Sequence, residues 1–98
     1  MPDALHSDAA VPTPTPARFV KQLASHLGRH CEVQEEAAGT RLVFAYGECL
    51  LAASDGTLDM HATAAGQEDL DHVTRVVGSH LERFGQRGEL VVSWQQRP

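Results

Sequence analysis

Histidine is the residue type in this 98-residue chain with the clearest chemical potential, since the chain carries six of them. His26 and His30 are four residues apart, a spacing that puts two imidazoles on one face of a helix, as in zinc proteins. Gly28 lies between them and can end the helix before His30. On that alternative, His26 favours the helix terminus and His30 begins a strand. His26 and His30 are therefore the candidate metal ligands, and no cofactor is predicted.

His80 and Arg83 form a second pair of polar residues, close to the end of a predicted helix. His80 falls within the apolar arc of that helix, so we expect a partly buried imidazole with a hydrogen-bond partner. Arg83 lies at the edge of the arc, where its guanidinium can meet a carboxylate. If the two helices run antiparallel, His80 lies roughly 20 Å from His26 at 1.5 Å per residue, which argues against a three-histidine centre.

The two cysteines match neither a CxxC metal pair nor a disulfide framework. Cys31 and Cys49 fall on strands that a third strand separates, roughly 9–10 Å apart and beyond disulfide reach. We therefore expect two reduced thiols in the core. We also expect His72 to be exposed on the solvent side of the second helix.

Composition changes near Pro16, which divides the chain into two predicted parts. Residues 1–15 are rich in Pro and Ala and contain little apolar bulk, so we expect a disordered leader there. Residues 16–98 are predicted to form one domain. A helix begins with Pro16 at its first position and ends near Leu27, and a second helix spans about 67–84. The intervening residues 31–63 and the final residues 90–94 alternate with the period of strands.

Two turn signals predict the register of the sheet. Asp55-Gly56, a favoured two-residue hairpin turn, predicts the pairs Ala53 with Leu58, Leu51 with Met60, and Cys49 with Ala62. A turn at Tyr46-Gly47 predicts the pairs Phe44 with Cys49 and Leu42 with Leu51. Both turns place these residues on one face, as a meander requires.

The predicted fold is α+β, in the order α-β-β-β-β-α-β, with an antiparallel five-stranded sheet. Both helices have an apolar stripe and the sheet has one apolar face, so a two-layer sandwich with both helices on that face buries all of them. The last strand pairs antiparallel with the first strand, in the order 5-1-2-3-4, or lies parallel beside the fourth.

The other face of the predicted sheet combines an apolar centre with a charged rim. Val43 faces Leu50, and Leu50 faces His61, in this register. Such a surface suits a protein partner, a second copy of the chain or a shallow ligand site. Mixed exposed strands also occur with no function. Val43, Leu50 and His61 are the candidate interface residues.

Charge and hydropathy exclude several classes of partner. The net charge of −5, with no basic stripe, argues against nucleic acid and anionic membranes. No apolar run approaches the ~20 residues of a membrane-spanning helix, and the N-terminus lacks the basic and apolar regions of a secretory signal. We therefore expect a cytoplasmic protein.

Two segments carry a resemblance to a known family: residues 23–30, which read LASHLGRH, and residues 80–90, which read HLERFGQRGEL. With the closing Trp94 they resemble the bacterial domain-of-unknown-function family DUF2218, over roughly residues 15–94. The resemblance implies a small domain, alone or fused to siderophore-interacting flavin-type ferric reductases. This chain has no flavin or nicotinamide module, so it implies an accessory or binding domain linked to iron handling, rather than an enzyme. The alternative is a metal-binding or enzymatic domain that uses His26, His30, His80 and Arg83.

Overall fold

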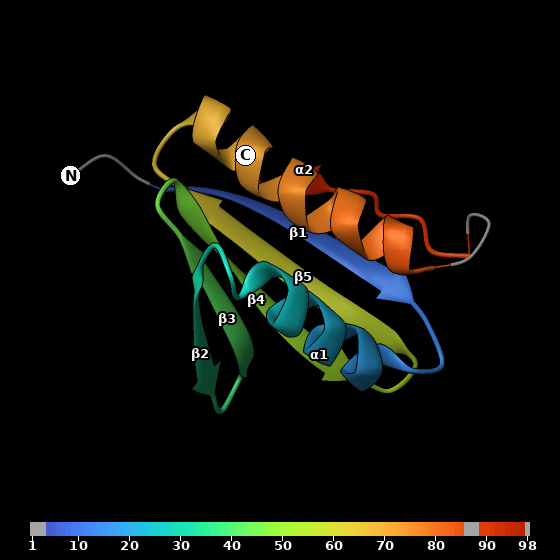
Figure 1. The fold of residues 1–98 in the computed structure, drawn as a ribbon. Helices are drawn as coiled ribbons and strands as arrows, with labels where there is room; N and C mark the ends of the chain where they lie inside the picture. Colours follow the sequence, from blue (N-terminus) through green and yellow to red (C-terminus); the bar gives the residue numbers. More distant parts are fainter. Residues whose placement is uncertain (1–3, 86–88, 98) are drawn as a thin grey trace.

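The computed structural model describes residues 4–85 and 89–97 and shows an α+β fold. Its elements are β1 (Leu5–Pro12), α1 (Pro16–Leu27), β2 (Glu32–Glu36), β3 (Gly39–Phe44), β4 (Gly47–Ser54), β5 (Thr57–Ala64), α2 (Gln67–Phe84) and β6 (Gln95–Gln96). The strands form one antiparallel six-stranded sheet in the order β2-β3-β4-β5-β1-β6. Both helices lie on the same face of this sheet (Figure 1), and the opposite face is open. No helix in the described part of the chain is long and apolar enough to cross a membrane.

The strand β1 corrects two predictions, the disordered leader and the five-stranded sheet. Residues 5–12 pair with β5 along its whole length, from Leu5 opposite Ala64 to Pro12 opposite Thr57. Ser7, Ala9 and Val11 are buried, at 3%, 5% and 1% exposure. These side chains are small, so composition alone suggested too little apolar surface to order the segment. Backbone pairing with a central strand supplies the missing stabilisation.

The C-terminal segment also differs from the prediction, because residues 90–94 do not form a strand. Only Gln95 and Gln96 pair with β1, opposite Asp8 and Ser7. Both predicted placements of the last strand are therefore wrong, since β1 occupies the place beside β5 and β6 lies outside β1. The preceding residues pack on α2 instead: a Cβ at Gly78 would lie 2.9 Å from the indole nitrogen of Trp94. A glycine in the helix thus allows this close approach.

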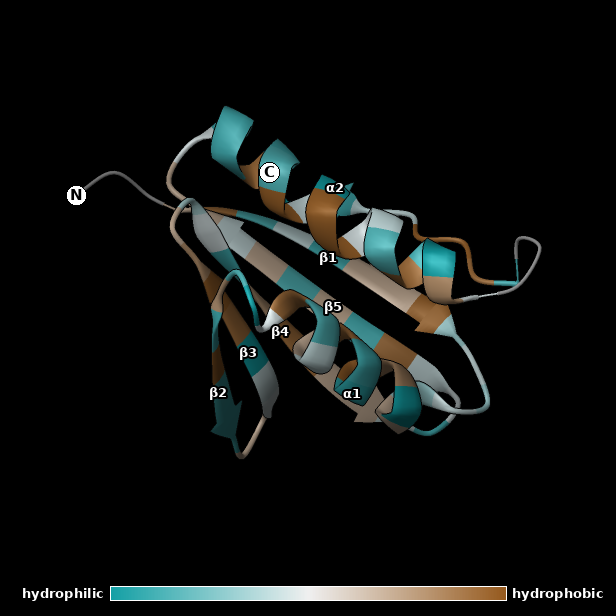
Figure 2. Ribbon diagram, viewed as in Figure 1, coloured by the Kyte–Doolittle hydropathy of each residue, from teal (hydrophilic) through white to brown (hydrophobic). Residues whose placement is uncertain are grey.

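The predicted register of the β4–β5 hairpin is confirmed, with all three expected pairs present. Between β3 and β4 the register differs by two residues, since Leu42 pairs with Cys49 and Phe44 with Gly47. The turn is formed by residues 45–46, one position earlier than predicted. A shift of two keeps every side chain on its face, so Leu42, Phe44, Cys49 and Leu51 are buried as expected. Apolar and polar residues alternate along these strands (Figure 2).

Both cysteines are free thiols, as the sequence predicts. Cys49 is fully buried, and burial raises the pKa of its thiol to about 12. Cys31 is half-buried, packs against the core, and burial raises its pKa as well. Because the thiolate is the reactive form, neither side chain is poised as a nucleophile.

Candidate binding site on the open face of the sheet

Polar side chains from both ends of the chain meet on the open face of the sheet. His6 and Asp8 come from β1, His61 from β5, and Arg97 directly follows β6. Asp8 lies opposite His61 in the antiparallel register, while Ser7 next to it points into the core. Sequence reasoning placed His61 correctly on this face but missed the other three. The alternation of His6, Asp8 and Ala10 with buried neighbours was the available signal.

Asp8 is the centre of this cluster. Its Oδ1 lies 2.5 Å from Nδ1 of His61, and its Oδ2 accepts a hydrogen bond of 2.7 Å from Nε of Arg97. The hydrogen bond from Arg97 is the main reason why the pKa of Asp8 falls to about 2, and His61 lowers it further. Asp8 is therefore a carboxylate at neutral pH. Nδ1 of His61 must then donate to it, so the guanidinium nitrogen 3.1 Å from the same Nδ1 is a neighbour without a hydrogen bond.

The remaining nitrogen of His61 faces another imidazole. Nε2 of His61 lies 3.2 Å from Nδ1 of His6, and the rings stack with centroids 5.1 Å apart. The hydroxyl of Thr63 lies 3.4 Å from the same Nδ1 of His6. A carboxylate that orients a histidine can serve a general base, but this requires the free nitrogen to reach a reacting proton. Here no hydroxyl or thiol among the described side chains contacts Nε2 of His61, so the cluster is better suited to binding than to nucleophilic catalysis.

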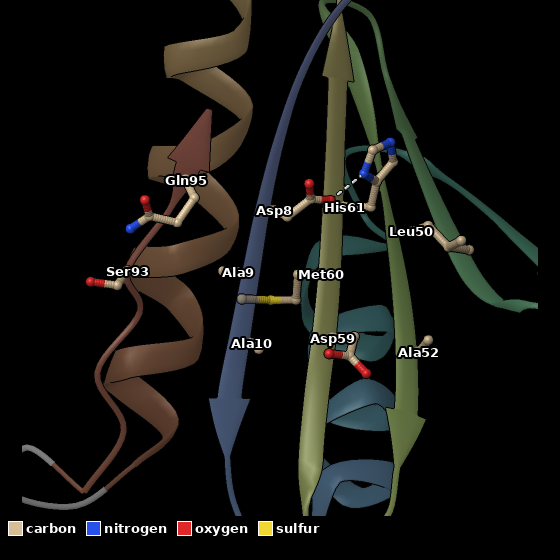
Figure 3. A pocket seen from close by; sticks show the side chains of 10 residues that line it. All are labelled: Asp8, Ala9, Ala10, Leu50, Ala52, Asp59, Met60, His61, Ser93 and Gln95. Atoms are coloured by element: carbon tan, nitrogen blue, oxygen red, sulfur yellow. Dashed lines mark hydrogen bonds and ion pairs between the residues drawn. The ribbon is translucent and has the colours of Figure 1, made fainter. Parts of the chain in front are cut away.

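A hollow of about 630 Å³ adjoins the cluster. Ala10, Leu50 and Ala52 supply apolar surface, and Asp8, Asp59, His61, Ser93 and Gln95 supply polar groups (Figure 3). Figure 3 shows Asp8 and His61 directed toward each other, with Ser93 and Gln95 on the far side of β1. Apolar surface with a few convergent polar groups is typical of small-molecule sites, and the volume falls in their usual range.

The predicted interface residues all lie on this open face, where each is partly exposed. The pairing of Leu50 with His61 is confirmed. Val43 pairs with Glu48 and Leu50 with Arg41, so the expected contact of Val43 opposite Leu50 is wrong, for the register difference described above. Arg41 bonds to Glu48 at 3.0 Å and to Glu36 at 2.7 Å. These ion pairs occupy the side of the face near β2 and leave the hollow on the side near β1.

The structure brings His26 and His80 together, against expectation. Their ring centroids are 5.1 Å apart, and His26 also lies 5.7 Å from the ring of Phe84. The predicted separation of roughly 20 Å assumed that α1 ends beside the start of α2. In the structure the last turn of α1 instead lies beside the last two turns of α2, as the contacts of His26 with His80 and Phe84 show.

His30 and Arg83, the other two predicted site residues, do not join the pair formed by His26 and His80. His30 is exposed and lies beyond the end of α1, so it does not share a helical face with His26. Within residues 4–85 and 89–97, no three His, Cys, Asp or Glu side chains gather as a metal site. His80 is half-buried and bonds to the carbonyl of Val76 at 2.6 Å, a partner within its own helix. Arg83 is exposed and has no ion pair in the described part of the chain.

His72 is the remaining histidine whose position differs from the prediction. Its ring stacks on Tyr46 with centroids 3.7 Å apart, and Tyr46 in turn stacks on Phe44. The expectation of simple exposure is wrong because the turn before β4 reaches the start of α2. The imidazole therefore has a packing role.

Acid is expected to destabilise the protein through Asp8. The folded state lowers its pKa from 3.8 to about 2, so its contribution is complete above about pH 4 and is lost as the pH falls toward 2. The free energy of unfolding, measured with urea across this range, should fall less steeply in Asp8→Asn than in the wild type. Arg97→Gln should flatten the curve similarly, because Arg97 is the main cause of the shift. An unchanged slope in both variants would contradict this account.

The comparisons with known proteins identify a family. The family model described as "Uncharacterized protein conserved in bacteria (DUF2218)" matches residues 8–95. A solved structure, PA4090 from Pseudomonas aeruginosa determined by NMR, is similar with a TM-score of 0.78 and 28% identity, over 93% of this chain and 95% of that chain. No curated protein matches. The family match includes β1 from Asp8 onward and reaches Gln95, so it covers nearly the whole sheet and both helices, and the chain belongs to the bacterial family DUF2218.

Proposed function

We propose that this chain is a small binding module, whose open sheet face accepts a ligand with a cationic group on a small apolar body. The hollow of about 630 Å³ beside Asp8 and His61 is the observation that carries the proposal. The helices cover only one face of the sheet, so this hollow is accessible (Figure 1). Ala10, Leu50 and Ala52 would contact the apolar body of the ligand.

The charges around the hollow favour a cationic group. Arg97 neutralises Asp8, and Arg41 pairs with Glu48. Asp59 is different, since its described partner is the hydroxyl of Ser54 at 3.0 Å. A hydroxyl stabilises a carboxylate without neutralising it, so Asp59 keeps a full negative charge at the edge of an apolar surface. An ammonium or guanidinium group placed there would gain a charge-assisted hydrogen bond.

The same charges make a second copy of the chain a poor occupant. Among the residues that the structure describes, five carboxylates lie on the open face against two guanidinium groups: Glu32, Glu36, Glu48, Asp59 and Asp8, with Arg41 and Arg97. A symmetric dimer through this face would place like charges against each other, which costs binding free energy. A protein partner at Val43, Leu50 and His61 would have to present a basic surface.

The test compares an amine with an uncharged molecule of the same shape. Benzylamine, added to ¹⁵N-labelled protein, should shift the amide signals of Leu50, Ala52 and Ala10 saturably, while benzyl alcohol should bind about tenfold more weakly, the value of one charge-assisted bond. Asp59→Asn should remove this preference. Glu68→Gln, the same change of charge on exposed α2, is the control and should keep it. Equal binding of amine and alcohol, or an unaffected Asp59→Asn, would refute the proposal.

The family resemblance supports a second, narrower proposal, a link to siderophore or iron handling in the cytoplasm. Two free thiols are compatible with a reducing compartment. The protein has one tryptophan, Trp94, next to Ser93 and Gln95 of the hollow. A ferric hydroxamate or catecholate chelate that binds there should quench its fluorescence saturably, and the iron-free chelator should not. If no ferric chelate quenches the fluorescence of Trp94 more than it quenches that of free tryptophan, the iron link is wrong. The amine test does not depend on this result.

A further inference from the structure

We propose that the corner between α1 and α2 is a second site, which binds a phosphate-type oxyanion through Arg29 and His26. This site lies on the helical layer and is separate from the hollow of the open sheet face. It goes beyond the function proposed above, because it uses a different surface and a ligand of opposite charge.

A small hollow of about 270 Å³ defines this corner, lined by Gln22, Ser25, His26, Arg29 and Phe84. The four polar side chains each carry an N–H or O–H group that can donate a hydrogen bond. Phe84 adds an aromatic wall. None of the lining residues in the described part of the chain is a carboxylate. A tetrahedral oxyanion accepts several hydrogen bonds at once, so it matches a set of donors that a metal ion would find unsuitable.

The segment formed by α1 and the turn after it is positively charged in an otherwise acidic protein. Residues 16–31 contain Arg18, Lys21 and Arg29 and no Asp or Glu, although the whole chain has a net charge of −5. Arg29 is exposed, so its guanidinium can contact a ligand without first breaking a buried ion pair. A guanidinium offers paired N–H groups in the geometry that phosphate oxygens accept. These properties favour a phosphoryl group over a neutral ligand.

One of the donors, His26, is also held in place by its neighbours. The ring of His26 packs between His80, 5.1 Å away, and the edge of Phe84, 5.7 Å away. His80 is itself fixed by its hydrogen bond to Val76. The turn that carries Arg29 is bonded to the helix end, because the amide of Gly28 donates to the carbonyl of Ala24 at 2.9 Å. The contacts of His26 reduce the conformational entropy that its side chain loses on binding.

The experiment is an NMR titration at constant ionic strength, with inorganic phosphate in one series and phenyl phosphate in the other, and chloride as the balancing anion. The ring signals of His26 and the Nε–H signal of Arg29 should shift saturably. Arg29→Gln should weaken binding at least about tenfold, as expected for loss of a charge-assisted hydrogen bond. Arg75→Gln is the matched control, since Arg75 is an exposed arginine on α2 outside the hollow. It should leave the affinity unchanged.

The outcomes distinguish specific binding in this hollow from nonspecific attraction of anions to surface charge. Tighter binding of phenyl phosphate, through Phe84, would identify the ligand as a phosphate ester, and equal binding would identify free phosphate. Both results support the oxyanion site. Shifts that do not saturate, or equal weakening by Arg29→Gln and Arg75→Gln, would overturn it. Because Arg29 and Arg75 are both exposed, both variants should fold, which the unchanged spread of backbone amide signals would verify.

Discussion

Removal of residues 1–12 should prevent the protein from folding. The deletion takes away β1, which lies between β5 and β6, and with it the buried side chains Ser7, Ala9 and Val11. It leaves the backbone N–H and C=O groups along one side of β5 without partners, and unpaired buried groups are costly. Far-ultraviolet circular dichroism and the spread of amide signals in a ¹⁵N spectrum would measure the loss of structure.

A shorter deletion is the control for this experiment. Removal of residues 1–4 keeps β1 from Leu5 onward and should preserve cooperative unfolding. If the fragment 13–98 instead unfolds cooperatively with the stability of the whole chain, β1 contributes nothing to the fold. The expectation of a domain that begins at Pro16 would then be restored.

Leu51→Ala should have the largest effect of any alanine substitution in β4, with a loss of about 3 kcal/mol in the free energy of unfolding. Leu51 is completely buried beneath the helices and pairs with Met60. Its neighbour Leu50 points to the open face and is partly exposed, so Leu50→Ala should cost less than about 1 kcal/mol. Urea unfolding of both variants gives the comparison. Similar losses in the two would mean that the assignment of Leu51 and Leu50 to opposite faces of β4 is wrong.

The β4–β5 hairpin shows what can be predicted from the sequence. Asp55-Gly56 favours a two-residue turn, Gly56 has the positive φ of +68° that such a turn needs, and the register follows from it. The turn before β4 offers a weaker signal, and Tyr46 takes the second turn position where the prediction had the first. The buried face was nevertheless correct, because hydrophobic alternation fixes the face even where it does not fix the register.

The candidate site could not be predicted in the same way, since it depends on contacts between distant segments. Asp8 and His61 are 53 residues apart, and Asp8 and Arg97 are 89 apart. Ser7 is polar and Ala9 is small, so composition does not mark β1 as a core strand. Without β1, the sequence offers no hydrogen-bonding partner for His61 on the open face. The meeting of His26 and His80 was missed for a related reason, because it depends on how far α1 extends along α2.

The position of β1 between β5 and β6 has a kinetic consequence. Strands β2 to β5 are joined by short turns and can pair soon after they meet, whereas β1 pairs with β5 only after a chain segment of about fifty residues closes a loop. Until then β5 is an edge strand, with Leu58, Met60, Ala62 and Ala64 alternating along it. Such an edge can pair with the same edge of another molecule. Refolding should therefore compete with aggregation at high protein concentration. This competition should end once β1 has paired with β5 and covered its edge.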